Sequence, residues 1–460
     1  MTDKKPKIKQ TSFLDPGTGD VVELIGDNQA TMFVVYNVLS EKFEVKDTFE
    51  CNEIVYIPPK DDLVANDTIL LPTYPEFGVP ITDLVNEIED FIYRYLDVSD
   101  SYRKLASYYV LLTWVYDCFE VLPYLRALGD YGTGKTRFQK IIGSLCYKPM
   151  FVAGATTPSP IFRIINLYRG TLIMDEADFR FSDTSAEIIK ILNCGYCKGV
   201  PVLRTEGDAK DRTPTSYVVY GPKIIATRKR FDDSALESRC LTEIMSGRPR
   251  SGIPIHLPKQ FDKEALKLRN FLLGFRLQNY GQLELNEKLA LPHVEPRINQ
   301  IILPILSIAK DEDTQEEITQ FINKYAENLT AQRGDETPAQ VLRAMVTMIS
   351  EGSELKCKEI AKKVNSERST EQGERPISPT TVGRMNSALF NFKTRRVNGK
   401  TEILWDSEKG KMLCERYDIA QDKPVEVVED VEASQESPPV IENDLEAQGE
   451  LPAGSETSST

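Results

Sequence analysis

The sequence has little of the material on which several protein classes depend. Only two histidines occur in 460 residues, which argues against histidine-based metal sites and histidine general bases. The longest uncharged apolar stretch in its middle, residues 105–116, spans twelve residues, whereas a membrane-spanning helix needs about 20. The N-terminus carries lysines with no apolar segment behind them, so we expect no signal peptide. The eight cysteines are scattered, which favours reduced thiols and a cytoplasmic protein without membrane attachment.

The composition is that of an ordinary soluble protein, but the charge is distributed unevenly. Hydrophobic residues make up 41% and charged residues 27% of the chain, which excludes wholesale disorder, collagen and a disulfide-rich miniprotein. Residues 421–460 hold eleven acidic residues and one lysine, so this tail supplies -10 of the net charge of -14. Residues 337–418 hold 15 basic and 11 acidic residues. We therefore predict a disordered acidic tail behind a mildly basic module that could bind nucleic acid.

Hydrophobic periodicity divides the rest of the chain. Short β-type runs occur at residues 32–38 and 54–57, whereas apolar residues recur at helical spacing over residues 81–95 and again over about 103–118. The predicted parts are a flexible basic arm (1–20), a small β-rich region (21–78), a helical lead-in (79–119), an α/β core (120–250), a helical lid (251–333), a helix-and-hairpin module (334–420) and the tail (421–460).

The strongest motif is a phosphate-binding loop of the form G-x-x-x-x-G-K-[ST]. It consists of Gly129, Asp130, Tyr131, Gly132, Thr133, Gly134, Lys135 and Thr136. A predicted strand (122–128) precedes the loop and a predicted helix (137–145) follows it, which is the context such a loop requires. Glycines let the backbone N–H groups surround phosphate oxygens at the start of the helix. We expect ATP binding, with Lys135 on the β and γ phosphates and the Thr136 hydroxyl on Mg²⁺.

A second strand, residues 170–174, ends in the carboxylates Asp175 and Glu176. Asp175 is expected to hold Mg²⁺ through water, and Glu176 to polarise the attacking water. Asp178 is interpreted as a solvated or helix-starting residue. A third strand, 220–227, ends at Thr227, where a group that senses the γ-phosphate would lie, and Arg239 follows before another apolar strand, 241–245.

This order of parts resembles the AAA+ P-loop ATPase domain of helicase-like proteins from phages, plasmids and integrated elements. The likeness covers residues 105–310 and is carried by residues 155–163, 171–178, 191–195, 202–204, 221–226, 296–297 and 303–309. It implies that Arg239 is an arginine finger acting on the ATP of a neighbouring subunit in a ring, which we expect to be a hexamer. It also implies that Thr227 is the first sensor, a position often occupied by asparagine, and that Arg297 is the second sensor.

Other interpretations of these residues stay open. Arg239 could pair with Glu237 or with a phosphate in its own subunit, and Arg297 could be a surface residue of the lid. Arg204 lies at the start of a polar insertion with Lys210 and Arg212; helicase-type relatives carry a DNA-contacting hairpin there, but an ordinary solvated loop would have the same composition. The pair Cys194 and Cys197 has no second pair or histidine nearby, which favours plain thiols over zinc.

The module at residues 334–420 is predicted to be a winged helix. Its sequence predicts helices over 338–349, 356–364 and 378–390, followed by strands over 392–397 and 400–405 joined by the turn Asn398-Gly399. The third helix would present Thr380, Thr381, Arg384 and Asn386. Together with Arg204 of the core, the expected DNA contacts are Arg384, Lys393, Arg395, Arg396 and Lys400. A protein-binding winged helix is the alternative.

These features predict an Mg²⁺-dependent ATPase, a ring-forming DNA helicase or translocase acting in replication of a mobile element or a related DNA transaction. Its partners would be DNA, further copies of the chain and replication proteins of the element. Two alternatives remain: an ATPase that loads or remodels a protein partner without unwinding DNA, and a DNA-binding regulator that uses ATP only for assembly.

Overall fold

The computed structural model describes residues 7–27, 29–59, 62–175, 183–206, 213–245, 247, 249–334, 337–368, 376–397 and 400–419. The chain forms two compact units, residues 1–329 and 330–460. Each unit has its own helices and strands.

The first unit begins with two small sheets. One is a four-stranded antiparallel sheet in the order β2–β3–β4–β5, with β2 at Phe13–Leu14, β3 at Asp20–Gly26, β4 at Thr31–Asn37 and β5 at Lys42–Lys46. The other has the order β1–β7–β6, with β1 at Lys7–Gln10, β7 at Ile54–Ile57 and β6 at Phe49–Cys51. Residues 7–14, expected in a flexible arm, are therefore ordered, because β1 pairs in parallel with β7 and the Ser12 hydroxyl donates to the carbonyls of Leu167 and Tyr168.

A five-stranded parallel sheet forms the centre of the first unit. Its order is β14–β8–β13–β10–β9, with β14 at Cys240–Ile244, β8 at Tyr124–Leu128, β13 at Lys223–Thr227, β10 at Leu172–Met174 and β9 at Met150–Val152. Side chains alternate between its faces: Leu125 and Ala127 belong to one buried cluster, and Tyr124 to the other. Burial on both faces is typical of parallel sheets covered by helices.

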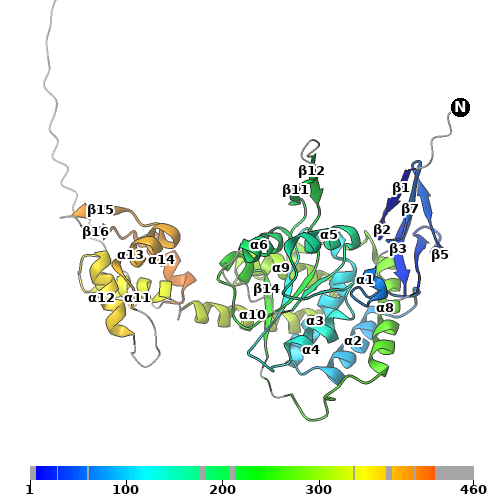
Figure 1. Cartoon of the computed structure of the whole chain (residues 1–460). Helices are drawn as coiled ribbons and strands as arrows, with labels where there is room; N and C mark the ends of the chain where they lie inside the picture. Colours follow the sequence, from blue (N-terminus) through cyan, green and yellow to red (C-terminus); the bar gives the residue numbers. More distant parts are fainter. Residues whose placement is uncertain are drawn as a thin grey trace, which may run out of the picture. The chain divides into compact units, whose positions relative to one another are not determined.

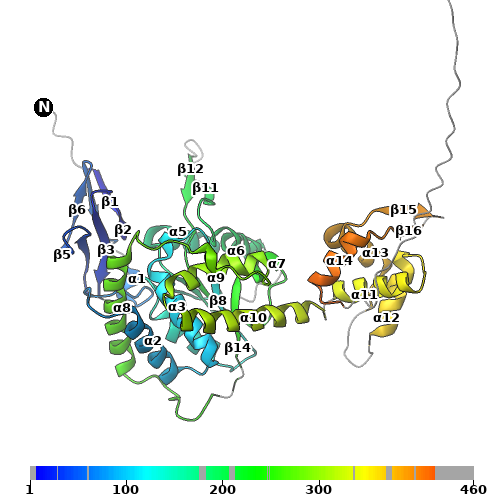
Figure 2. The same ribbon diagram turned by 180° about the vertical axis from the view of Figure 1, so that it is seen from behind.

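Helices cover both faces of this sheet (Figures 1 and 2), which confirms the predicted α/β fold class. One face carries α2 (Ile81–Tyr95), α3 (Asp100–Trp114), α4 (Lys135–Gly143), α8 (Gln260–Asn279), α9 (Pro296–Ile308) and α10 (Glu312–Gly334). The other carries α5 (Pro158–Tyr168), α6 (Asp183–Cys194) and α7 (Ser234–Glu237). Shorter helices are α1 (Asp62–Ala65), η1 (Tyr116–Cys118) and η2 (Glu287–Leu289). A hairpin of β11 (Val202–Glu206) and β12 (Thr213–Tyr217) projects from this body in both views.

A buried ion network joins the N-terminal sheet to the rest of the first unit. Glu23 of β3 is fully buried and binds Arg276 of α8 (2.5 Å) and Lys148 (2.9 Å). Arg276 also binds Asp117, and the Tyr147 hydroxyl donates to Glu23 at 2.9 Å. Burial lowers the pKa of Lys148 to about 8, opposed by the attraction of Glu23. This network joins four segments that are far apart in the chain, at residues 23, 117, 147–148 and 276.

Among the described residues of the second unit are the three helices and the hairpin that the sequence predicted. They are α11 (Thr337–Ser350), α12 (Cys357–Glu367), α13 (Pro379–Met385) continued by the π-helical turn η4 (Asn386–Phe390), and the strands β15 (Thr394–Val397) and β16 (Lys400–Ile403). The Ser378 side chain caps α13 by accepting the Thr381 N–H. A further helix, α14 (Ser407–Arg416), was not predicted; it packs Leu413 and Cys414 into the same core. Within the described part of the chain, no helix is long and apolar enough to cross a membrane.

Candidate active site

The predicted phosphate loop connects the end of β8 to the start of α4. Gly132 (φ 71°) and Gly134 (φ 93°) adopt the left-handed conformation that favours glycine, and Gly134 is the residue preceding α4. Gly129 has no room for a side chain, because a Cβ there would lie 2.7 Å from the Thr133 hydroxyl. The loop therefore has the backbone that brings N–H groups to the positive end of a helix, an arrangement suited to phosphate.

The reactive side chains of the loop lie beside the carboxylate of β10. Lys135 folds over the loop, and its Nζ donates to the carbonyls of Gly129 (2.8 Å) and Asp130 (2.7 Å). The Thr136 hydroxyl lies 3.2 Å from Oδ2 of Asp175. A hydroxyl and a carboxylate at this separation are the oxygen ligands that Mg²⁺ prefers beside phosphates. Glu176, the predicted water-polarising residue, and Asp178 lie outside the described residues.

Thr227 lies at the same edge of the sheet. The register of β13 with β8 places it next to Leu128, the residue before the loop, and its carbonyl accepts the Gly129 N–H at 3.2 Å. Its side chain is buried, yet Oγ1 has no hydrogen-bond partner among the residues that the structure describes. A buried hydroxyl without a partner costs free energy. The unsatisfied atom fits a site whose partner, such as a phosphate or an attacking water, belongs to the substrate.

Some features around the loop were not predicted from the sequence. Tyr131 is 73% exposed, and the guanidinium carbon of Arg228 lies 4.5 Å from its ring centroid. A cleft of about 690 Å³ opens beside Thr136 and Asp175, and α8 contributes Arg269 to its wall. Burial lowers the pKa of Arg269 to about 10, and its guanidinium donates to the carbonyls of Leu71 and Ser144. The spacing of apolar residues in α8 predicts a helix, but it does not predict that Arg269 would line the cleft beside Thr136 and Asp175.

Arg239 lies far from the predicted phosphate loop. It directly precedes β14, whose first residue pairs with Tyr124 at the amino end of β8. The loop leaves the carboxyl end of β8, about 13 Å away along a five-residue strand. Arg239 is 7% exposed; its Nη1 donates to Oδ1 of Asn193 at 2.5 Å, and its guanidinium carbon lies 4.1 Å from the Tyr196 ring centroid.

The alternative pairing of Arg239 with Glu237 does not occur in this structure. Glu237 instead accepts two hydrogen bonds of 2.5 Å from Arg126, a fully buried residue in the middle of β8, and one of 2.8 Å from Arg230. Burial alone would raise the pKa of Glu237, but the hydrogen bonds and charge of Arg126 hold it below its ordinary value. The carboxylate is thus already engaged, which leaves Arg239 to other partners.

Arg297 lies beside Arg239 and not at the predicted phosphate loop. It is the second residue of α9, and its Nη1 donates to the Tyr196 hydroxyl and to Gln300, both at 3.0 Å. Its guanidinium carbon lies 5.1 Å from the Tyr196 ring centroid. Tyr196 belongs to the turn after α6, and its carbonyl accepts the N–H of Leu122 just before β8. This places Arg297 at the amino end of the sheet.

Lys223 and Gly195 support the turn that carries Tyr196. The buried Lys223 donates from Nζ to the carbonyls of Gly195 (2.9 Å), Val219 (3.1 Å) and Gly221 (2.8 Å), and it faces the Tyr124 ring. A Cβ at Gly195 would lie 2.5 Å from that Nζ. Burial lowers the pKa of Lys223 to about 7. Both residues lie in segments that carry the family resemblance, 191–195 and 221–226, but the sequence indicated no role for either of them.

The predicted DNA contacts are in different situations. Arg204 on β11 binds Glu187 at 3.0 Å and stacks near Phe162, so it holds the base of the hairpin; Lys210 and Arg212 lie outside the described residues. In the second unit Arg384, Lys393 and Arg396 are exposed. Arg395 forms an ion pair with Glu402, and Lys400 begins β16.

Asn386 does not face solvent as expected for a DNA contact. It is 2% exposed, and its amide exchanges two hydrogen bonds with the backbone of Phe392. Asn386 follows the buried Val382 by four residues, so regular helical spacing already places both on the inward face of the helix. Its amide fixes the start of the wing.

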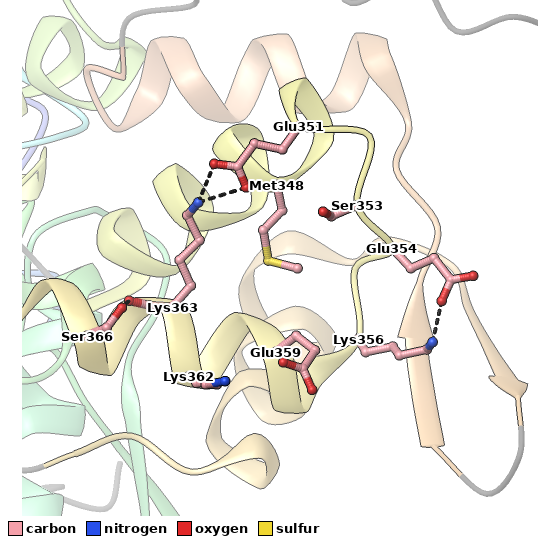
Figure 3. A pocket seen from close by; sticks show the side chains of 9 residues that line it. All are labelled: Met348, Glu351, Ser353, Glu354, Lys356, Glu359, Lys362, Lys363 and Ser366. Carbon is pink, nitrogen blue, oxygen red and sulfur yellow. Dashed lines mark hydrogen bonds and ion pairs between the residues drawn. The ribbon is translucent and has the colours of Figure 1, made fainter.

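A groove of about 450 Å³ between α11 and α12 carries charges of both signs (Figure 3). Lys363 binds Glu351 at 2.8 Å across it, and Met348 lies at its apolar wall. Because the lysines of this groove alternate with glutamates, it lacks the single-signed surface that attracts a phosphate backbone. The exposed Arg384, Lys393 and Arg396 lie outside this groove, on α13 and at the wing.

Comparisons with known proteins give distant structural likenesses. No protein-family model and no curated protein matches the chain. Among solved structures, the apo C-terminal region of NrS-1 is 11% identical over 85% of this chain and 100% of that chain, with a TM-score of 0.34. SCCmec type IV Cch, described as an active helicase, is 10% identical over 88% and 80%, with a TM-score of 0.38. The inhibitor-bound JCV helicase is 13% identical over 54% and 61%, with a TM-score of 0.24. At these scores the likenesses carry no weight for the activity.

Proposed function

We propose that this protein is an Mg²⁺-dependent ATPase of the AAA+ type that works as a helicase-like motor on DNA. The proposal is carried by four groups that border the glycine-rich loop at one edge of the parallel sheet. They are the Lys135 ammonium, the Thr136 hydroxyl, the Asp175 carboxylate 3.2 Å from that hydroxyl, and the unsatisfied Thr227 hydroxyl.

Each group has a distinct task in phosphoryl transfer. Lys135 exchanges its two loop carbonyls for the β and γ phosphates, which are stronger acceptors. Thr136 and Asp175 would hold Mg²⁺, which supplies positive charge to the phosphate oxygens when it is bound. Thr227 would donate its hydrogen bond to the γ-phosphate or to the attacking water, and Glu176, by its place after Asp175, would polarise that water.

The proposed site also takes an arginine from a neighbouring subunit. Arg239 is at the opposite end of β8 from the loop, so it can reach a nucleotide only in a neighbouring copy of the chain. This favours a closed ring, in which each subunit supplies its arginine to the next. DNA contact is assigned to the exposed Arg384, Lys393 and Arg396 of the winged-helix unit and to the β11–β12 hairpin.

Turnover of ATP by site variants tests the proposal. Lys135→Ala should abolish ATP binding, because the lysine is the main protein cation on the phosphates. Asp175→Asn should lower turnover and shift the Mg²⁺ dependence to higher concentration, because an amide is a weaker ligand than a carboxylate. Lys288→Ala, which changes an exposed lysine of η2, serves as the matched control.

The measurement is phosphate release at saturating ATP together with equilibrium binding of a fluorescent ATP analogue. The proposal fails if Lys135→Ala and Lys288→Ala hydrolyse ATP alike, or if the parent protein hydrolyses none in the presence of Mg²⁺ and DNA.

A further inference from the structure

The exposed apolar side chains of the second unit lie close to one turn. Among its described residues, the large apolar side chains with much exposed surface are Leu389, Leu404 and Met412, at 45%, 36% and 70%. The turn is Asn391, whose carbonyl accepts a hydrogen bond of 2.8 Å from Lys409 Nζ. Leu389 lies two residues before this turn, and Met412 lies three residues after Lys409 on α14. A group of exposed apolar residues with a polar rim is typical of a protein-binding surface.

Cations without ion-pair partners border the same turn. Lys393 follows Asn391 by two residues, and its carbonyl accepts the Leu404 N–H at 2.8 Å. Arg384, Lys393 and Arg396 are exposed, and none of them forms an ion pair within the described part of the chain, whereas two lysines of the α11–α12 groove pair with glutamates. The apolar and basic residues next to the turn are called the Asn391 surface; they are Leu389, Lys393, Leu404, Lys409 and Met412.

The chain itself contains a segment of matching composition. Residues 425–432 read Val-Glu-Val-Val-Glu-Asp-Val-Glu, with four valines, four acidic residues and no basic residue. The phosphates of DNA would neutralise the cations of the Asn391 surface but would leave its apolar side chains exposed. This segment carries both carboxylates for the lysines and apolar side chains for the leucines and the methionine. It therefore complements the surface in charge and in hydrophobicity.

The end of the described chain lies next to this surface. Ile419, the last residue that the structure describes, is buried and donates its N–H to a carbonyl of α14 at 2.9 Å. The ring centroid of Tyr417 lies 6.3 Å from that of Phe390, which directly precedes Asn391. The six residues 420–425 span at most about 20 Å, which is enough to bring the segment to the surface. So short a connection gives the segment an effective concentration of about 1 mM at the surface.

We propose that residues 425–432 bind the Asn391 surface of their own chain and thereby exclude DNA from the wing. The valines pack against the apolar side chains of the surface, and the carboxylates pair with its lysines. Lys393 belongs both to this surface and to the proposed DNA interface, so the segment and DNA cannot occupy it together. The exclusion of DNA rests on the proposed function, whereas the docking of the segment does not.

Carbodiimide coupling tests the docking in the full chain, without ATP or DNA. The reagent joins carboxylates to amines in direct contact, and peptide mass spectrometry locates the new bonds. We expect the carboxylates of residues 425–432 to couple to Lys393 and Lys409. Coupling to Lys358 and Lys362, exposed control lysines of α12, should be at least about fivefold weaker. Equal coupling to both pairs, or no coupling, would refute the docking.

Two additions make this experiment specific. In a mixture of isotopically heavy and light chains, bonds between heavy and light peptides would place the segment on a second copy and would overturn the proposal. Met412→Ser removes an apolar contact and no charge, and its side chain is 70% exposed, so thermal stability should stay at the parent value. Coupling to Lys409 should fall severalfold in this variant, and unchanged coupling would refute the apolar contact.

Three sets of substitutions separate docking from a diffuse effect of negative charge on DNA binding. The first set neutralises the acidic residues of the segment: Glu426→Gln, Glu429→Gln, Asp430→Asn and Glu432→Gln. The second set keeps the charges and replaces the four valines by serine: Val425→Ser, Val427→Ser, Val428→Ser and Val431→Ser. The third set is the matched control and neutralises four acidic residues further along: Glu442→Gln, Asp444→Asn, Glu446→Gln and Glu450→Gln.

The first two sets should raise the affinity of the full chain for DNA about tenfold. This is the gain expected when a segment with a Kd of about 0.1 mM and an effective concentration of about 1 mM no longer binds. The control set should raise the affinity by less than about twofold, because its charges are screened by salt. Equal gains in the first and third sets would show a diffuse charge effect, and an unchanged affinity in the valine set would remove the apolar contact. Either result overturns the proposal.

The outcomes separate this inference from the proposed function. If the segment couples to Lys393 and Lys409 but neither the parent nor any variant binds DNA, the docking stands and the proposed action on DNA fails. If the parent binds DNA and all three sets bind it equally well, the proposed function stands and the exclusion of DNA by the segment is refuted.

Discussion

Replacing Glu237 by glutamine should destabilise the first unit strongly, because it leaves a buried guanidinium without its counter-ion. The Arg126 side chain has no exposed surface, and its described partners are Glu237, through two hydrogen bonds of 2.5 Å, and the Thr242 hydroxyl at 3.0 Å. Removal of one partner of a buried ion pair typically costs about 3–5 kcal/mol. Arg230, whose side chain is 35% exposed, can instead turn to water at little cost.

We therefore expect the free energy of unfolding of Glu237→Gln to fall by about 3 kcal/mol, measured by urea unfolding at pH 7. Arg230→Ala removes only the exposed partner and should cost less than about 1 kcal/mol. The double variant Arg126→Met/Glu237→Gln should regain most of the loss, because no charge remains buried. A fall of under about 1 kcal/mol in Glu237→Gln would refute the account of this pair.

The same pair has a pH dependence of known sign. The pKa of Glu237 is lower in the folded protein than its ordinary value of 4.5. Its stabilising contribution is therefore complete above pH 4.5 and is lost as the pH falls through the lower, folded-state pKa. The difference in unfolding free energy between the parent and Glu237→Gln should shrink over that acidic range and stay constant between pH 6 and 8.

Three further changes test other parts of the structure. Burial lowers the pKa of Lys223 to about 7, so between pH 7 and 9 the unfolded chain binds a proton at this lysine that the folded protein does not. The unfolding free energy of the parent relative to Lys223→Met, measured by urea titration, should therefore rise over this range by up to about 1.4 kcal/mol per pH unit. A difference that stays flat with pH would show that the three carbonyls keep the ammonium charged. Gly195→Ala should lower the unfolding free energy by about 1–3 kcal/mol in the same assay, because the added Cβ would lie 2.5 Å from the Lys223 Nζ. Gly383→Ala in α13 is the control, because a Cβ there meets no atom within 4 Å and the unfolding free energy should not fall. Lys393→Ala/Arg396→Ala should weaken DNA binding and reduce the slope of log affinity against log salt by about 0.9 for each phosphate that the protein no longer neutralises, while DNA-free ATP turnover stays at the parent rate; an unchanged slope would remove the wing from the DNA interface.

Hydrophobic spacing and turn residues predicted the helices, strands and loops whose conformation is set by residues close by in the sequence. The apolar spacing of residues 81–95 predicted α2, whose bounds are Ile81–Tyr95. The loop from Gly129 to Thr136 lies between a strand and a helix, as its glycines and its apolar flanks indicated. Such features are set within one or two turns or strands, which is the range over which hydrophobic periodicity and turn chemistry act.

Contacts between distant residues were beyond the reach of those patterns. Arg297 and Tyr196 are 101 residues apart, and their hydrogen bond follows from the packing of α9 at the amino end of the sheet. Arg126 interrupts an apolar strand, and nothing local pairs it with Glu237, which is 111 residues away. The two hydrogen bonds between the Asn386 amide and the Phe392 backbone likewise join the third helix to the wing.

The measurement that tests the central claim most directly is the rate of ATP hydrolysis per chain as a function of protein concentration, followed together with mass photometry. The two halves of the proposed active site lie at opposite ends of β8, so a single copy cannot complete it. The account predicts that turnover per chain is near zero where the protein is monomeric and rises to a plateau as the ring assembles. A turnover per chain that is constant down to concentrations at which only monomers are present would contradict it.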